Sequence, residues 1–357
     1  MSELNRIVDY PARDMTITVE AGLRIDALQA TLAKERQRLP VDIAQAERAT
    51  LGGALATNTS GPRRFGHSTF RDYVIGLSAV DADGRLFKAG GRVVKNVAGY
   101  DLCKLLVGSR GTLAVVTQVT LKLRPLPETS AQLWLTFDWF RTIEDRLAGL
   151  LTSQTRPVAI EVLNPAAAAL IATSARCDLP ANAPVLCIGV EGSKRDVEWQ
   201  LQMLSQELTT GGLQESRQIR DHDADRIWEA LTEFQTCADD PLTFEANLRP
   251  SQCMAFAERA TELGVAVQVH AGNGQVIGQL LEESATIDQT VSILNELGTV
   301  ARSAGGNLVV LHCDSTWKSR MPMCGTPEPS WVLMKQLKSK LDPQGLLNPG
   351  RFVDAAP

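Results

Sequence analysis

Glycine recurs through the stretch from Thr50 to Pro127, and this pattern constrains the fold more than any other feature of the chain. The stretch begins within ATLGGALATNTSGPRRFGHSTFRDYVIGL (49–77) and continues through KNVAGYDLCKLLVGSRGTLAVVTQVTLKL (95–123). The glycines between its short apolar runs are Gly52, Gly53, Gly61, Gly66, Gly99, Gly108 and Gly111. Glycines in such positions let a backbone turn tightly or approach a bulky ligand closely. The pattern predicts a ligand-binding backbone, with the turns of an ordinary mixed sheet as the alternative.

The pair Gly52-Gly53 precedes Ala54–Asn58, for which we predict the first turn of a short helix. N–H groups at the beginning of a helix lack partners within the helix and carry partial positive charge, so they bind phosphates and other electron-rich groups. We expect these N–H groups to be free and to face a pyrophosphate or the edge of a cofactor ring.

Two motifs of the glycine-rich stretch resemble those of a known flavoprotein family. Residues 52–74 match the pattern GG…AxNxxG…(Y/F)G…DxV, and residues 99–117 match GYDL…GSxGTLxx(V/I)T, in the right order and spacing. Both patterns belong to the second half of the FAD-binding domain of the vanillyl-alcohol-oxidase/PCMH flavoproteins, specifically the FAD-linked oxidases of 2-hydroxy acids. There the two segments wrap FAD. The segment KNVAGYDL (95–102) is similar, more narrowly, to the FAD-binding subunits of glycolate oxidases.

The resemblance implies an α+β fold in two domains and a tail. It covers about residues 7–127 strongly, and it covers the second domain only weakly except at 265–278, 305–318 and 341–352. We predict a PCMH-type FAD-binding domain at 1–127, a ferredoxin-like α+β cap domain at 128–340, and a C-terminal tail at 341–357 that returns to the FAD-binding domain. The tail contains LDPQGLLNPGRF (341–352), which matches the terminal motif of the family.

We expect the FAD-binding domain to be incomplete at its N-terminus. The PxGGGT-type loop that binds the FAD pyrophosphate in the family does not occur in this sequence. Either Met1 is a start placed too far downstream, which we favour, or the chain holds FAD with half of the usual contacts.

The resemblance also implies which residues bind FAD. Arg63 and Arg64 are suited to the pyrophosphate because guanidinium groups pair well with phosphate, and the backbone near Val115 and Thr117 meets the adenine end. Covalent attachment of FAD through His67 is a further hypothesis, which an intact-mass measurement tests. The predicted FAD-binding residues are Thr50, Gly52, Gly53, Thr57, Asn58, Gly61, Arg64, Gly66, Gly111, Val115, Thr117 and Asn348.

The catalytic constellation of the family is eroded in this chain. Catalytic members carry HxGDGNxH and GGSxSGEHG, whose histidines and glutamate bind a divalent metal or the substrate. Here the sequences are HAGNGQVI (270–277) and GGNLVVLH (305–312), so Ile277 and Leu311 replace two polar ligands. His270 and His312 remain as candidates for catalysis if they meet in space. Two ligands rarely hold a catalytic metal ion, so we predict no metal site. The alternative to a catalytic role for His270 is that it ends a buried strand and bonds a backbone carbonyl.

Hydrophobic patterns predict the remaining elements. Residues 15–22 alternate like a strand, 25–39 have the spacing of an amphipathic helix ended by Pro40, 73–86 form a hairpin with an Asp83-Gly84 turn, and 111–123 form a strand pair. No internal repeat is visible, and His222 lies in a charged segment predicted as a solvated turn. Beyond a boundary near 125–130 we predict strands at 132–137, 158–163, 185–192 and 265–270, and helices at 194–208 and 252–263. That order predicts an antiparallel sheet with helices on one face.

Composition excludes several other classes of protein. A net charge of −5 gives no reason to expect nucleic acid as a partner. The seven cysteines show no CxxC spacing, which argues against zinc or an iron–sulfur cluster within the chain. No signal sequence and no apolar run of membrane-spanning length is visible. We therefore expect a cytoplasmic protein that inserts in no membrane directly and reaches the inner membrane only through a partner.

The resemblance implies an FAD-binding subunit of a multi-subunit glycolate (2-hydroxy-acid) oxidase or dehydrogenase. Its partners would be a sister FAD-linked oxidase subunit that oxidises glycolate and an iron–sulfur subunit that receives the electrons. One alternative is a catalytically silent structural partner that binds no FAD. The other is a stand-alone FAD-linked oxidoreductase, with Tyr100 or Lys318 as base.

Overall fold

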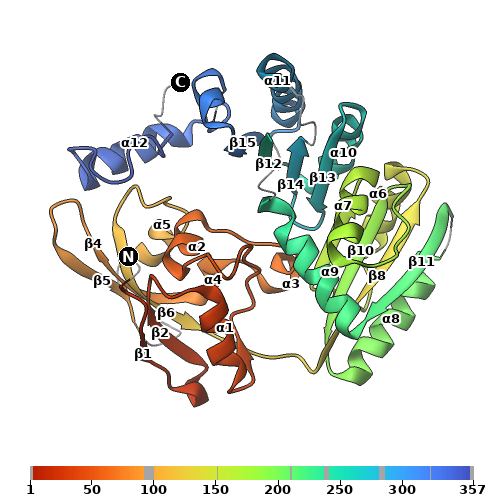
Figure 1. Cartoon of the computed structure of the whole chain (residues 1–357), viewed down its shortest axis with the longest axis horizontal. Helices are drawn as coiled ribbons and strands as arrows, with labels where there is room; N and C mark the ends of the chain where they lie inside the picture. The colour runs from red at the N-terminus through yellow and green to blue at the C-terminus, as the bar shows by residue number, and fades with distance from the viewer. Residues whose placement is uncertain are drawn as a thin grey trace. The chain divides into compact units, whose positions relative to one another are not determined.

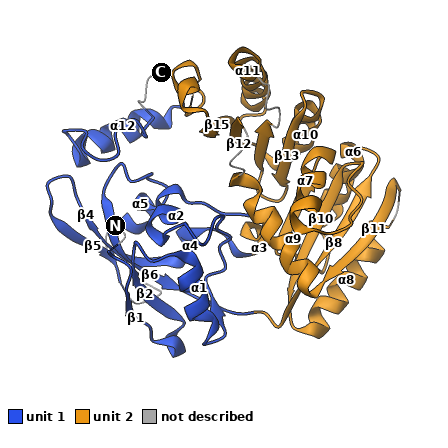
Figure 2. Cartoon of the chain, viewed as in Figure 1, with its two compact units in different colours: residues 1–61, 67–126, 327–356 blue, residues 62–66, 127–326, 357 orange. Residues whose placement is uncertain are grey.

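The computed structural model describes residues 3–91, 100–150, 152–209, 211–236, 241–280, 286–321 and 323–353. Helices and strands are mixed along the chain (Figure 1), and internal contacts divide it into two compact units (Figure 2). Unit 1 comprises residues 1–61, 67–126 and 327–356, and unit 2 comprises residues 62–66, 127–326 and 357. The domain boundaries predicted from the sequence stay a prediction.

Within the described residues, unit 1 is built on a five-stranded antiparallel sheet in the order β1-β2-β6-β4-β5. Apolar residues of β2, β4 and β6 pack with those of α1 and α2 in one buried cluster. The strands of the sheet are β1 (Ile7–Asp9), β2 (Thr16–Glu20), β4 (Val74–Val80), β5 (Leu86–Gly90) and β6 (Val115–Lys122), while β3 (Gln37–Arg38) pairs with β7 (Arg124–Pro125). The helices of this unit are α1 (Ile25–Ala33), α2 (Leu51–Thr57), α4 (Phe70–Tyr73), α5 (Leu102–Leu106) and α12 (Ser330–Leu341), and α3 (Arg64–His67) lies where the chain returns from unit 2.

Two predicted elements of unit 1 differ from the structure. The helix predicted to reach Leu39 ends at Ala33, because Arg36 turns the chain in the left-handed region (φ 54°) and the next two residues form β3. The predicted strand pair at 111–123 is the single strand β6. The predicted hairpin is confirmed, with β4 and β5 joined through a turn in which Gly84 has φ 80°.

The described part of unit 2 forms an eight-stranded antiparallel sheet in the order β11-β8-β10-β9-β13-β14-β12-β15. The first four strands in chain order and the last four each follow the 4-1-3-2 order of a ferredoxin-like unit. The two ferredoxin-like units join where β9 pairs with β13. The topology therefore contains an internal repeat that the sequence does not reveal. The strands are β8 (Thr129–Phe137), β9 (Ala159–Leu163), β10 (Val185–Gly192), β11 (Leu213–Arg220), β12 (Leu242–Asn247), β13 (Val265–His270), β14 (Gln275–Leu280) and β15 (Asn307–Cys313).

Helices cover both faces of this sheet, so the prediction of helices on one face is wrong. Leu133 and Leu135 of β8 pack with helices α6, α8, α10 and α11, whereas Trp134 between them packs with α7 and α9 on the opposite face. Helix α9 begins within the charged segment around His222, which was predicted as a turn. The helices are α6 (Phe140–Leu150), α7 (Pro165–Ala175), α8 (Lys194–Leu208), α9 (Asp221–Glu233), α10 (Cys253–Glu262) and α11 (Ile287–Ser303). Short 3₁₀ helices lie at Ala12–Asp14 (η1), Phe234–Thr236 (η2), Pro250–Gln252 (η3) and Ser315–Arg320 (η4).

Candidate functional site

The N–H groups at the beginning of α2 are bonded within the chain. Leu51 N–H donates to the carbonyl of Leu23 (2.9 Å), Gly52 N–H to that of Ala21 (2.7 Å), and Gly53 N–H to Oγ1 of Thr50 (3.2 Å). The prediction that these groups are free for a pyrophosphate is therefore wrong. The contacts of Thr50, Gly52 and Gly53 with FAD stay a prediction.

Gly52 lets α2 approach the end of β2 closely. A Cβ atom at this position would lie 2.8 Å from Cβ and 2.9 Å from the carbonyl oxygen of Ala21. We expect Gly52→Ala to lower the free energy of unfolding by about 1–3 kcal/mol, because the added methyl group overlaps Ala21. Gly53→Ala is the matched control, since its Cβ would meet only Oγ1 of Thr50, at 3.2 Å. Urea unfolding of both variants measures the difference, and equal stabilities would contradict this role of Gly52.

The C-terminal end of α2 meets the loop that contains the second motif. Gly108 N–H donates to the carbonyl of Leu55 (3.0 Å), and Arg110 N–H donates to that of Ala56 (2.7 Å). Asn58 ends the helix in the left-handed region (φ 51°), and its Oδ1 is buried with no hydrogen-bond partner in the described part of the chain. The structure thus brings together two motifs that are distant in the sequence. The start of the second motif, Gly99, lies outside the described residues.

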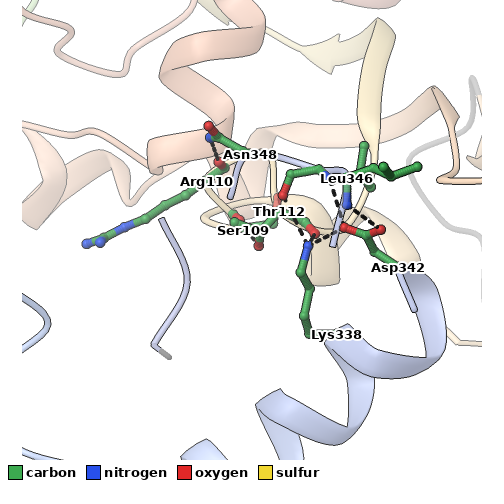
Figure 3. A network of polar contacts seen from close by, with 8 residues as sticks. Ser109, Arg110, Thr112, Lys338, Asp342, Leu346 and Asn348 are labelled. Carbon is green, nitrogen blue, oxygen red and sulfur yellow. Dashed lines mark hydrogen bonds and ion pairs between the residues drawn. The ribbon is translucent and has the colours of Figure 1, made fainter. Parts of the chain in front are cut away.

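The C-terminal tail docks on the same loop through Lys338 and Asp342 (Figure 3). Nζ of Lys338 donates to the carbonyls of Thr112 (2.7 Å) and Leu347 (3.1 Å) and forms an ion pair with Asp342. The Asp342 carboxylate also accepts the N–H groups of Leu346 (2.9 Å) and Leu347 (2.8 Å). Burial alone would raise the pKa of Asp342. The hydrogen bonds lower the pKa by more than burial raises it, so that it falls to about 2. We call this set of contacts the tail latch.

Asn348 completes the contact between tail and loop. Its Nδ2 donates to the carbonyl of Arg110 (2.6 Å; Figure 3). The same Nδ2 lies 3.6 Å from where a Cβ of Gly111 would be. Arg110 and Gly111 both have positive φ, at 53° and 68°. Among the described residues no acceptor bonds the N–H group of Gly111. The terminal motif and the glycine-rich segment are therefore in contact within unit 1.

The polar groups of this region fit a ligand with the chemistry of FAD. Buried polar atoms normally have hydrogen-bond partners, so the buried acceptor Oδ1 of Asn58 can take a donor from outside the chain. The N–H group of Gly111, which is half-buried, is a donor without an acceptor among the described residues. A dinucleotide offers hydroxyl groups to such an acceptor and phosphate oxygens to such a donor. Val115, the next predicted contact along this segment, is 39% exposed.

Three other predicted FAD-binding residues have local partners. The hydroxyl of Thr57 bonds carbonyl groups of its own helix, and that of Thr117 donates to a carbonyl of β4 (3.1 Å). A Cβ at Gly61 would lie 2.8 Å from Cβ of Asp42. These contacts explain the residues structurally, and their contacts with FAD stay predictions.

Residues Pro62–Gly66, which we call the strap, belong to unit 2. Nε of Arg63 donates to Oε1 of Glu191 (2.5 Å), and its guanidinium lies 3.9 Å from the ring centroid of Trp228. Glu191 is only 3% exposed. Arg63 therefore serves as an anchor of the strap rather than as an open phosphate ligand.

Arg64 and Gly66 of the strap also contact unit 2. Arg64 donates to Oε1 of Gln275, and burial lowers the pKa of its guanidinium, while nearby glutamates oppose that shift. Gly66 N–H donates to the carbonyl of Val158 (3.0 Å), whose Cα would lie 2.7 Å from a Cβ at Gly66. The contacts of Arg64 and Gly66 with FAD stay predictions. His67, in unit 1, has Nε2 3.1 Å from Nη2 of Arg38.

His270 lies in a buried polar cluster of unit 2. Its Nδ1 is 2.8 Å from Oε1 of Glu161, and Nε2 of Gln268 donates to Oε2 of the same carboxylate (2.7 Å). The exposed fractions of Glu161, Gln268 and His270 are 1%, 1% and 4%. His270 does end a buried strand, β13, as the alternative interpretation expected, but its side chain bonds the carboxylate of Glu161 and not a backbone carbonyl.

His270 and His312 do not meet. His312 is exposed on β15, paired with Thr243 of β12, and β14 and β12 separate β15 from β13. Because neighbouring strands lie about 4.8 Å apart, three steps separate these strands by about 14 Å. Within the described ranges no three His, Cys, Asp or Glu side chains gather as metal ligands. Tyr100 and Lys318 are both exposed.

Sequence reasoning missed Glu161 and the tail latch. Glu161 is the charged residue within the apolar run VAIEVL (158–163), and a charge in a buried strand signals a paired group. Lys338 and Asp342 are four residues apart, the spacing of neighbours on a helix. Both signals are readable in the sequence.

Comparisons with known proteins agree with this geometry. The chain matches a family model described as "FAD binding domain" at residues 1–90 and one described as "FAD linked oxidases, C-terminal domain" at residues 126–352. It is 26% identical to glycolate oxidase subunit GlcD of Bacillus subtilis, over 98% of this chain and 77% of that protein. It is 27% identical to glycolate oxidase subunit GlcE of Escherichia coli, over 97% of this chain and 84% of that protein.

A solved structure of p-cresol methylhydroxylase with substrate bound has a similar fold. The TM-score is 0.73 at 17% identity, over 98% of this chain and 78% of the other. The predicted α+β fold, a PCMH-type FAD-binding domain followed by a second α+β domain, is confirmed, and so is FAD as the cofactor. In the part of the chain that the structure describes, no helix is long and apolar enough to cross a membrane. The chain belongs to the FAD-linked oxidases.

Proposed function

We propose that this chain is the FAD-binding subunit, of the GlcE type, of a multi-subunit glycolate (2-hydroxy-acid) oxidase or dehydrogenase. The proposal rests on the similarity of nearly the whole chain to two glycolate oxidase subunits. A sister FAD-linked subunit oxidises glycolate, and this chain binds FAD and supports electron transfer to an iron–sulfur subunit. We place the complex in the cytoplasm, at the inner membrane through its partners.

The replacements Ile277 and Leu311 support this division of labour. Catalytic members of the family that this chain resembles carry polar ligands at these two positions. Bound FAD would supply the capacity to take up and pass on electrons. We propose that unit 1 holds the cofactor through the loop at Gly111, the end of α2 at Asn58, and Asn348 of the tail. The other proposed contacts are Thr50, Gly52, Gly53, Thr57, Gly61, Arg64, Gly66, Val115 and Thr117.

Absorbance of the purified chain tests the proposal. Bound oxidised flavin absorbs between roughly 350 and 500 nm and loses these bands on reduction. We expect the chain alone to show flavin bands that glycolate does not bleach without oxygen. We expect bleaching once the sister subunit is co-expressed and co-purified.

Two outcomes would contradict the proposal. A folded chain without flavin would favour a structural partner that binds no FAD. Bleaching of the isolated chain by glycolate would favour a stand-alone oxidoreductase. The sister subunit expressed without this chain is the control, because it shows how far glycolate bleaches that subunit's own flavin.

A further inference from the structure

Cationic side chains gather in unit 1 where β6 passes into β7. In the two-stranded pair of β3 with β7, Arg38 lies directly opposite Arg124. Lys122 is the last residue of β6, and its Nζ lies 5.4 Å from the ring centroid of Tyr73. Nη2 of Arg38 lies 3.1 Å from Nε2 of His67. We call Arg38, Lys122, Arg124 and the Tyr73 ring the cationic corner.

The charges of the cationic corner act on one ring. Burial raises the pKa of Tyr73, whereas a hydrogen bond from Arg124 and the charges of Arg124 and Arg38 act to lower it. The charge of Asp72 also acts to raise it. Tyr73 is only 3% exposed, but Arg38 and Lys122 are half-buried and Arg124 is exposed. The cationic corner therefore combines a buried ring with charged groups that a ligand from solvent can reach.

This arrangement of like charges is unfavourable by itself. Like charges directly opposite each other on neighbouring strands are destabilising, and Arg38 and Arg124 are such a pair. The exposed segment before β3 adds Lys34 and Arg36 but one carboxylate, Glu35, so it makes the surroundings more positive. The chain as a whole has a net charge of −5, so its composition does not explain this concentration of cations. An anion bound between the two guanidinium groups would offset their repulsion.

We propose that Arg38, Lys122 and Arg124 bind the phosphate group of a small ligand. A guanidinium group presents a planar fork of donors that matches two phosphate oxygens, and an ammonium group adds a point charge. Donors from three strands need more acceptor oxygens than the two of a planar carboxylate, and a tetrahedral phosphate group supplies them. Its charge of about −2 also matches the two guanidinium groups. The source is either inorganic phosphate or a phosphate monoester.

The cationic corner is separate from the proposed FAD contacts around Gly111. Gly111 precedes β6, Val115 begins this strand, and Lys122 ends it. The eight residues of β6 span about 23 Å, because a strand rises about 3.3 Å per residue. We therefore expect phosphate and FAD to bind without competing.

Equilibrium dialysis of the full-length chain against ³²P-labelled inorganic phosphate, at neutral pH and at an ionic strength fixed with sodium chloride, tests the inference. We expect one phosphate to bind per chain and to stay bound when FAD or acetate is added. Methyl phosphate as a competitor distinguishes the sources, since stronger competition than by unlabelled phosphate indicates a monoester and weaker competition indicates inorganic phosphate. A folded chain that binds no phosphate, or phosphate that FAD or acetate displaces, would overturn the inference.

Arg124→Gln sharpens the test. The side chain of Arg124 is exposed, so its replacement leaves the buried core of unit 1 in place. We expect the affinity for phosphate to fall about tenfold or more, as is typical of one lost hydrogen bond to a charged group. Arg85→Gln is the matched control, because Arg85 is an exposed arginine of the same unit, paired with Asp83, and should leave the affinity unchanged. Equal losses in the two variants would reveal a general effect of net charge and would also overturn the inference.

The inference does not rest on the proposed function. A chain with flavin bands that binds no phosphate overturns only the inference. A chain without flavin can still bind phosphate, and the dialysis of the unaltered chain decides that question whether or not the variants fold.

Discussion

Arg63→Met is expected to lower the free energy of unfolding of unit 2 by about 3–5 kcal/mol, the cost typical of removing one partner of a buried ion pair. The substitution leaves the carboxylate of Glu191, 3% exposed, without the guanidinium that lies 2.5 Å away. It also removes the cation–π contact with Trp228. Chemical unfolding followed by tryptophan fluorescence measures the loss, since Trp228 reports on this site directly.

A double-mutant cycle separates the ion pair from simple loss of packing. Glu191→Leu alone leaves the partly buried Arg63 without this carboxylate, whereas Arg63→Met with Glu191→Leu removes both charges together. We expect the double variant to lose less free energy of unfolding than the two single variants lose together. The reason is that the double variant buries neither charge without the opposite charge. Strict additivity would show that the pair contributes nothing as a pair. The exposed ion pair of Arg217 with Glu215 is the matched control, for which the same cycle should give less than about 1 kcal/mol.

Asp342→Asn is expected to release the tail latch. The substitution removes the charge that holds Nζ of Lys338 and one of the acceptors for the N–H groups of Leu346 and Leu347. We expect the amide hydrogens of these two leucines to exchange about 100-fold faster, which corresponds to about 2–3 kcal/mol. We also expect bound flavin to dissociate faster, since Asn348 follows directly. The exposed Lys340→Gln, on the same helix, is the control, and unchanged exchange in Asp342→Asn would contradict the latch.

The tail latch also predicts how the docked tail responds to acid. The pKa of Asp342 is lowered from its ordinary value of 3.8 to about 2. A carboxyl group whose pKa is lowered by folding stabilises the folded state above its ordinary pKa, and that contribution disappears as the pH falls through the lowered value. We expect the tail to stay docked at pH 5 and to lose this stabilisation progressively between pH 4 and pH 2. Exchange of the Leu346 amide against pH measures it, and a transition centred above pH 4 would contradict the assignment.

Local patterns in the sequence predicted many elements because each strand or helix expresses its own periodicity. The strand at 185–192 and the helix at 194–208 were predicted with the bounds that the structure shows. Element ends that depend on distant partners were less predictable. Helix α1 stops early because Gln37 and Arg38 pair with Arg124 and Pro125, which lie far along the chain.

The candidate site was predictable in part. The glycine-rich segments and the terminal motif, which the resemblance singled out, are in contact within unit 1. The hydrogen-bond partners of individual N–H groups and side chains were not predictable, because they come from residues that are distant in the sequence. The N–H groups of Gly52 and Gly53 are bonded within the chain, and Arg63 is held by Glu191 and Trp228. The second covered face of the sheet was also missed, because no helix was predicted at 165–175 and the charged segment around His222 was predicted as a turn.

The junction of β9 with β13 has an evolutionary consequence. Repeated topology without visible sequence similarity is the pattern expected when an ancestral gene segment is duplicated and the copies diverge. Glu161 is encoded in the first copy and His270 in the second, so neither copy alone would have held the pair. The carboxylate–imidazole contact would then postdate the duplication, and a search for its origin belongs among proteins that carry both copies in tandem.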